Sequence, residues 1–144
     1  MNDHDASLIE RACTRLVLEA SAANDRHDFG TFASLFAADA VLYRPSGEPL
    51  RGRLAIIESY RARPRSRMTR HVCSNVLVHV ETASAARALT YVVVYGADAE
   101  IPPDGHFGVA CEPRRLVGEF ADRFALTTEG WRIKERRARF VMHT

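Results

Sequence analysis

The chain has 144 residues, of which 47% are hydrophobic and 26% charged, and its 20 basic and 18 acidic side chains leave a formal net charge of +2. This length and composition predict one domain over residues 1–144 with an apolar core, and they exclude an extensively disordered protein. The arginines are spread along the chain, and the densest group, at 61–70, has no aromatic residues between them, which argues against a nucleic-acid partner.

The cysteines and the apolar runs indicate in which cellular compartment the protein is expected. Cys13, Cys73 and Cys111 lie far apart and form no CxxC pair, which is typical of free thiols in a reducing environment. The first 16 residues are too charged for the apolar core of a signal peptide, and no apolar run approaches the roughly 18 residues of a membrane span. We therefore expect a cytoplasmic protein with no membrane partner.

Two helices are predicted first. Ser7 and Glu10 have the spacing of a capping box, and apolar residues recur behind them at helical spacing to about residue 25. Asp28 then has the position of an N-cap for a second helix that carries apolar residues as far as Phe36.

A short hairpin over 38–52 and a third helix ending before Pro64 come next. The remaining chain is rich in β-formers, with strands expected at 71–80, 87–95, 114–127 and 130–141. These runs are too long for a parallel βα repeat, so helices followed by an antiparallel meander predict the α+β class. The long connection at 96–113 is either a lid over a binding site or a surface excursion.

His71 opens the first of the long strands. Strict alternation places it on one face with Cys73, Asn75 and Leu77, which is a mixed face of the kind that lines a ligand pocket. A polar sheet edge or a subunit contact would show the same pattern. The residues alone therefore leave His71 either as a functional side chain or as a histidine that merely starts a strand.

Asp25 lies at the end of the first predicted helix. The apolar stripe brings Asn24 rather than Asp25 nearest the core, although helical phase is unreliable in a last turn. An aspartate is unfavourable at this end of the helix dipole, so either a turn or a specific partner accounts for it.

Common cofactor and metal motifs are absent. The histidines have no metal-ligand spacing, and no Walker loop, G-x-G-x-x-G or G-x-S-x-G occurs. We expect no metal and no bound cofactor.

Three segments carry a family resemblance, in the order "ASAANDRHDFGTFASLFAADAVLYRPSGEPLRGRLAIIESY", "RHVCSNVLVHV" and "GEFADRFALTTEGWRIKERR". Over about residues 7–141 the chain resembles the SnoaL-like branch of the nuclear-transport-factor-like (cystatin-like cone) superfamily. The resemblance implies three N-terminal helices packed in a strongly curved, mainly antiparallel sheet with an internal pocket, commonly in homodimers or larger homo-oligomers. Members include scytalone dehydratase, bile-acid dehydratase, hexachlorocyclohexane dehydrochlorinase, ketosteroid isomerase, polyketide cyclases and dioxygenase small subunits.

The resemblance also implies roles for Asp25 and His71. In the dehydratase and dehydrochlorinase members an aspartate at the end of the first helix orients a histidine that removes a proton, and these two residues fall on those positions. A carboxylate that accepts one ring N–H fixes the tautomer and stabilises the imidazolium formed when the other nitrogen takes a proton.

Two positions depart from the pattern. Ala20 stands where some dehydratases carry an aromatic hydroxyl, and Arg44 stands where ketosteroid isomerases carry the carboxylate base. An isomerase mechanism of that form is therefore not expected. The missing acid could come from the set Tyr43, Tyr91, Tyr95, His106 or a C-terminal arginine.

The expected function is that of a cofactor-independent lyase or isomerase, with catalytic His71 and Asp25, acting on a small hydrophobic cyclic molecule. The expected substrate-binding residues are Phe36, Tyr43, Asn75, Tyr91, Arg136 and Arg137. Alternation groups Arg137 with Trp131, whereas the family-like W-x-I-x-x-R spacing points to Arg136, so both stay open. The alternatives are a binding module that holds a small molecule without turning it over, and a structural role like that of a dioxygenase small subunit.

Overall fold

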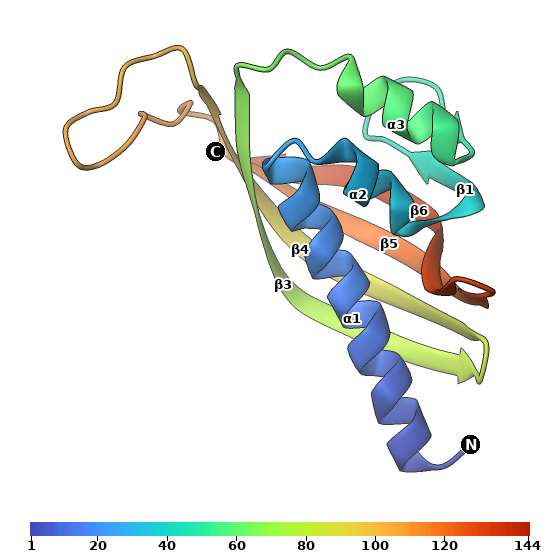
Figure 1. Ribbon diagram of the computed structural model, residues 1–144. Coiled ribbons are helices and arrows are strands. Elements are labelled where there is room, and N and C mark those ends of the chain that lie inside the picture. Colours follow the sequence, from blue (N-terminus) through green and yellow to red (C-terminus); the bar gives the residue numbers. More distant parts are fainter.

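The computed structural model describes residues 1–144 and places three helices on one face of a bent sheet (Figure 1). The elements in chain order are α1 (Asp3–Asp25), α2 (Phe29–Ser34), β1 (Phe36–Tyr43), β2 (Leu50–Arg51), α3 (Arg53–Arg61), β3 (Arg67–Thr82), β4 (Ala85–Asp98), β5 (Leu116–Thr127) and β6 (Gly130–His143). The six strands form one sheet in the order β2-β1-β6-β5-β4-β3. Only β1 and β6 pair in parallel, so the predicted α+β class with a curved, mainly antiparallel sheet is confirmed.

Helix α1 begins earlier than the capping-box spacing predicted. Asn2 is the N-cap, and its side-chain oxygen accepts a hydrogen bond from the Asp5 amide at 2.8 Å. Ser7 lies inside the helix, where its hydroxyl donates to the Asp3 carbonyl at 2.9 Å. The prediction of Ser7 as the cap was wrong because the preceding Asn2 fills that role and acidic Asp3 and Asp5 suit the positive end of the helix dipole.

Helix α2 is shorter than predicted. Its N-cap is Asp28, as expected, since the carboxylate accepts a hydrogen bond from the Thr31 amide at 3.2 Å. The helix ends at Ser34, however, and Phe36 opens β1 instead of closing the helix. The Ile133 amide in β6 donates to the Leu35 carbonyl at 3.0 Å, so pairing with a distant strand overrides the local helical pattern.

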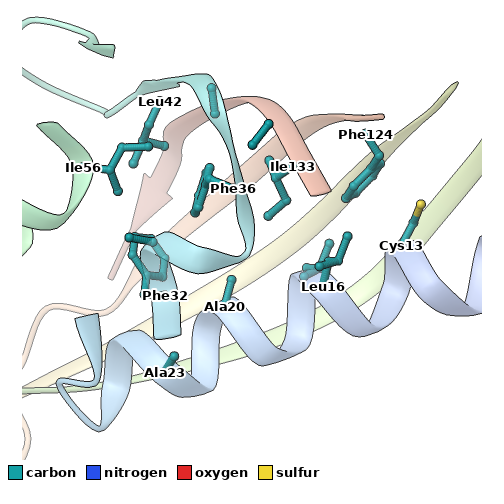
Figure 2. Close-up of a cluster of buried hydrophobic side chains, with 14 of the residues drawn as sticks. Cys13, Leu16, Ala20, Ala23, Phe32, Phe36, Leu42, Ile56, Phe124 and Ile133 are labelled. Carbon is teal, nitrogen blue, oxygen red and sulfur yellow. The ribbon is translucent and has the colours of Figure 1, made fainter. Parts of the chain in front are cut away.

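The core lies between α1 and the helix-facing side of the sheet. Figure 2 shows Cys13, Leu16, Ala20 and Ala23 as one stripe of α1 that faces side chains of the other elements. Their partners include Phe32, Phe36, Leu42, Ile56, Phe124 and Ile133. The small residues Ala20 and Ala23 let the last turns of α1 approach the rest of the fold closely, which brings the end of that helix over the start of β3.

Two β-bulges change which side chains face the helices. In β3 the register shifts between Ser74 and Leu77, where Asn75 has a left-handed φ of 50°. In the β5–β6 pair the register shifts where Phe124 opposes Ile133 but Arg123 opposes Glu135. An extra residue in one strand inverts the alternation beyond it, so side-chain directions cannot be counted through either bulge.

The connection between β4 and β5 projects from the body (Figure 1). It spans 99–115, since β4 continues to Asp98, and its Phe107 is 91% exposed. None of residues 99–113 lines the cavity described below, which favours the surface excursion over the lid. No helix of the structure is both long and apolar enough to cross a membrane.

Candidate functional site

A cavity of about 440 Å³ lies between the three helices and the curved sheet. Its volume is within the range of small-molecule sites, and apolar and polar side chains share its wall. The residues toward the helices include Ser21, Asn24, Phe32 and Tyr60, and those on the long strands include Thr69, His71, Val92, Val94, Phe120 and Arg136.

Asp25 and His71 are in direct contact in this structure. The His71 Nδ1 lies 2.5 Å from Asp25 Oδ1, and the backbone amide of His71 donates to Asp25 Oδ2 at 2.9 Å. The Thr69 hydroxyl donates to Asp25 Oδ1 at 2.9 Å. Three donors from one strand therefore fix the carboxylate at the end of α1.

The turn after α1 holds Asp25 against β3. His27 has a left-handed φ of 59°, and its Nε2 lies 2.7 Å from the carbonyl oxygen of Arg67 at the start of β3. The His27 ring stacks on Phe29 with 5.4 Å between ring centroids. Because the turn that follows Asp25 is anchored in this way, the carboxylate reaches β3, although the apolar stripe of α1 points at the buried Asn24.

The environment of Asp25 favours its ionised form. Burial opposes ionisation, since the side chain is 12% exposed, but the hydrogen bonds from the His71 ring, the His71 amide and the Thr69 hydroxyl outweigh it. The pKa of Asp25 is therefore below its ordinary value. An ionised carboxylate accepts a proton-bearing Nδ1, which leaves Nε2 as the nitrogen with a free lone pair.

His71 is placed to use that second nitrogen. The side chain is 12% exposed and lines the cavity, and Nε2 makes no hydrogen bond to the protein. It shares its face with Cys73, whose Sγ lies 3.2 Å from the Ser21 hydroxyl, and burial raises the pKa of that thiol. A neutral, inert neighbour leaves His71 as the basic group on this part of the wall.

Arg136, one of the two arginines that the sequence left open, lines the cavity. It is 3% exposed and forms a bidentate salt bridge with Asp122, in which Nε donates to Oδ1 at 2.7 Å and Nη2 donates to Oδ2 at 2.8 Å. Burial works against its charge, but Asp122 raises the pKa of Arg136 above its ordinary value. The bulge in β6 explains why Arg136 and not Arg137 faces inward with Ile133.

The structure places the other expected pocket residues outside the cavity wall. The exposed Arg137 lies over the ring of Tyr43 at 3.9 Å, on the side away from the site. Asn75 is exposed at the β3 bulge, and Tyr91 is 45% exposed on the face turned away from the helices. Phe36 is fully buried in the core beside Phe32.

The structure corrects the predicted position of these residues for three reasons. Alternation counted from His71 fails beyond the Asn75 bulge, so Val76 rather than Asn75 follows Cys73 on the inner face. Tyr91 alternates with Val92, which points inward. Phe36 belongs to a strand of the core rather than to a helix beside the pocket.

Tyr60 was missed as a site residue because its helical spacing marked it only as a core position. It is 6% exposed and lines the cavity, and its ring packs against Phe32 with 4.5 Å between centroids. Its hydroxyl makes no hydrogen bond within the protein. Of the groups proposed from sequence as the acid, Arg136 lines the cavity, whereas Tyr43, Tyr91, Tyr95 and His106 do not. Tyr60 is the tyrosine that can reach a ligand there.

No group of three or more His, Cys, Asp or Glu side chains is arranged to hold a metal ion.

The sequence and the fold were compared with those of known proteins. The sequence profile of a family described as the SnoaL-like domain matches residues 5–137. No curated protein sequence matches the chain significantly.

Solved structures share the fold. A candidate scytalone dehydratase from Novosphingobium aromaticivorans has a TM-score of 0.80 at 20% identity, over 99% of this chain and 91% of that one. An aspartate-to-asparagine variant of Rv3472, a protein of unknown function from Mycobacterium tuberculosis, has a TM-score of 0.76 at 25% identity, over 98% of this chain and 77% of that one. The hexachlorocyclohexane dehydrochlorinase LinA-type3 from Novosphingobium barchaimii has a TM-score of 0.82 at 16% identity, over 99% and 93%.

Proposed function

The chain belongs to the SnoaL-like family, and from this premise we propose that it is a cofactor-independent lyase or isomerase that removes a proton from carbon in a small ring-containing substrate. The observation that carries the proposal is the contact between Asp25 and His71 at the wall of a cavity. Of the structural relatives, one is described as a candidate scytalone dehydratase and another as a dehydrochlorinase. Those names describe elimination chemistry in the relatives and support the same reaction class here.

The basic step uses the His71 ring. With Nδ1–H donated to the ionised Asp25, Nε2 takes the proton from the substrate carbon and the ring becomes an imidazolium. The electron pair of the broken C–H bond forms a double bond, either with departure of hydroxide or halide from the neighbouring carbon or with a shift of an existing double bond. Asp25 stabilises the new positive charge, and the three hydrogen bonds to it keep the ring in one orientation.

The acid that assists the leaving group is Tyr60 in this proposal. Its hydroxyl is free of protein partners, and packing against Phe29 and Phe32 fixes the ring at the cavity wall. A phenol can donate a hydrogen bond or a proton to a departing oxygen or to a developing oxyanion. The buried Arg136 supplies a fixed positive charge on the sheet side of the cavity, where it stabilises negative charge that develops in the transition state.

The proposed proton abstraction can be tested without the natural substrate. A panel of cyclic ketones and of ring compounds with a hydroxyl or halide beside an acidic C–H is incubated with the protein in D₂O. Proton abstraction is then read by NMR as loss of the ¹H signal at the acidic carbon, whether or not elimination follows. We expect exchange that falls about 10²- to 10⁴-fold in His71→Ala, the range typical of a lost general base.

His79→Ala is the matched control, since His79 is an exposed histidine on the same strand and does not line the cavity. Tyr60→Phe should slow any complete elimination, and it should slow exchange less than His71→Ala does, because the phenol assists a developing oxyanion or a leaving group but does not remove the proton. Exchange that persists in His71→Ala, or that is lost equally in His79→Ala, would contradict the proposed base. Binding of panel compounds without any exchange would instead support the binding-module alternative.

A further inference from the structure

The wall of the cavity has an unbalanced charge. Five arginines and no aspartate or glutamate line it, the arginines being Arg44, Arg63, Arg67, Arg136 and Arg139. An apolar, uncharged substrate would not require such a wall. The positive charge available to a ligand depends on which of these arginines are paired with acidic side chains of the protein.

Three of the five have acidic partners. Arg136 is paired with Asp122 as described, and Arg67 Nη1 lies 2.5 Å from Glu112 Oε1. Arg139 Nη2 lies 3.0 Å from Glu119 Oε2. The positive charges of these three arginines are therefore compensated by acidic side chains of the same chain.

Arg44 has no acidic partner. Its Nη1 donates to the Ser59 hydroxyl at 2.9 Å and its Nη2 to the Glu48 carbonyl at 3.4 Å, so both acceptors are neutral oxygens. The Nε atom is buried without any hydrogen-bond partner. A guanidinium has five N–H donors, and here two of them are used. The group is therefore held in place by α3 and by the turn after β1 while its charge stays uncompensated.

Arg63 is also without an acidic partner. It follows α3 and stacks on the Tyr60 ring with 4.0 Å from its guanidinium carbon to the ring centroid. Arg44 and Arg63 are thus anchored on the neighbouring residues Ser59 and Tyr60, and both line the same cavity.

We infer that the substrate carries a carboxylate, which Arg44 and Arg63 bind while its apolar ring extends toward His71. This inference names the substrate class of the proposed function and rests on it. The planar guanidinium fork matches the two oxygens of a carboxylate. The same wall also contains the apolar side chains of Leu42, Phe32 and Phe120, which suit the ring.

The experiment compares binding of matched anionic and neutral probes, measured by calorimetry or ligand-observed NMR. The pairs are 2-naphthoate with 2-naphthamide, and cyclohexanecarboxylate with cyclohexanecarboxamide. On the wild-type protein, each carboxylate should bind about tenfold or more tightly than its carboxamide. Arg44→Gln and Arg63→Gln should each lower carboxylate affinity about 10- to 100-fold and leave carboxamide affinity within about twofold.

Arg51→Gln is the matched control, because Arg51 is an exposed arginine on the same hairpin and its removal changes the net charge equally. Arg63 is exposed, so Arg63→Gln keeps the variant arm usable if Arg44→Gln fails to fold. The wild-type comparison needs no variant at all. Equal or weaker binding of the carboxylates, or binding of no probe in either pair at millimolar concentration, would overturn the inference.

The two proposals fail separately. His71→Ala should retain the preference for carboxylates, because His71 takes no part in holding the anion. A preference for carboxylates without proton exchange would support the anion site and contradict the proposed enzymatic activity. Proton exchange on neutral panel compounds without a preference for carboxylates would support the activity and contradict the anion site.

Discussion

Replacing Asp25 by asparagine tests the geometry of the site through stability, which can be measured without a substrate. The Oδ1 position accepts hydrogen bonds from Thr69 and from the His71 ring, and the Oδ2 position accepts the His71 amide. An asparagine oxygen can keep the first two. Its NH₂ group then faces the His71 amide, so two donors oppose each other in a buried place.

The expected loss follows from these contacts. A buried N–H left without an acceptor costs about 1–3 kcal/mol, and two hydrogen bonds that lose their charge assistance cost about 1 kcal/mol more together. The free energy of unfolding should therefore fall by about 2–4 kcal/mol, which for a chain of this size lowers Tm by roughly 5–15 °C. Asp39→Asn, at an exposed aspartate with no ion pair, should change stability by less than about 0.5 kcal/mol.

The pH dependence gives the sharper test. The pKa of Asp25 is lower in the folded protein than in the unfolded chain, so its stabilisation is complete above the ordinary aspartate pKa of about 3.9 and is lost as the pH falls through the folded-state pKa. Denaturant unfolding at about pH 7 and about pH 3 should show the difference between wild type and Asp25→Asn shrinking at the lower pH. No stability loss at neutral pH, or the same loss at both, would refute the reasoning about the ionised carboxylate.

Three further predictions concern the rest of the fold. Asp122→Asn leaves Arg136 charged and buried without its partner and should lower the free energy of unfolding in urea by about 3–5 kcal/mol. Glu135→Gln, which removes a half-buried carboxylate paired with the exposed Arg137, should lower it by less than about 1 kcal/mol. Similar losses in the two variants would contradict the buried pair. Among the thiols, exposed Cys111 should react rapidly with a disulfide reagent, while Cys13, whose pKa burial and Asp122 raise to about 12, should react only on unfolding, as thiol labelling with mass spectrometry will show. The sheet face turned away from the helices exposes Val72, Leu77, Leu89 and Tyr91. Leu77→Asp should therefore shift the expected homo-oligomer toward the monomer in light scattering, whereas Leu54→Asp, at an exposed leucine of α3, should not. A monomeric wild-type protein would contradict the expected oligomer.

Several elements could be read from local sequence. Asp28 caps α2 because a short acidic side chain before an apolar helix satisfies a free amide, and that logic needs no distant residue. The α1 stripe of Cys13, Leu16, Ala20 and Ala23 faces the core as its spacing predicts. The class, the meander and the third helix rest on equally local signals.

The site depended on the resemblance as well as on the residues. Spacing alone left the roles of Asp25 and His71 ambiguous. The phase of a helix is poorly defined in its last turn, and alternation along a strand does not say which of its two faces lines a pocket. The positions that the resemblance implied are the ones that the structure brings to 2.5 Å. Tyr60 carried no signal beyond an apolar helical position, since a core residue and a cavity residue have the same spacing.

Local spacing was sufficient to predict the order of helices and most strands and the apolar stripe of α1, and the family resemblance added Asp25 and His71 as a possible pair. Tertiary structure alone decided which side chains reach the cavity. The bulges at Asn75 and in β6 invert alternation, so Asn75 turns outward and Arg136 rather than Arg137 turns inward. Such inversions, and the absence of an acidic partner at Arg44, arise from strand register and from contacts between distant segments, which no local spacing encodes.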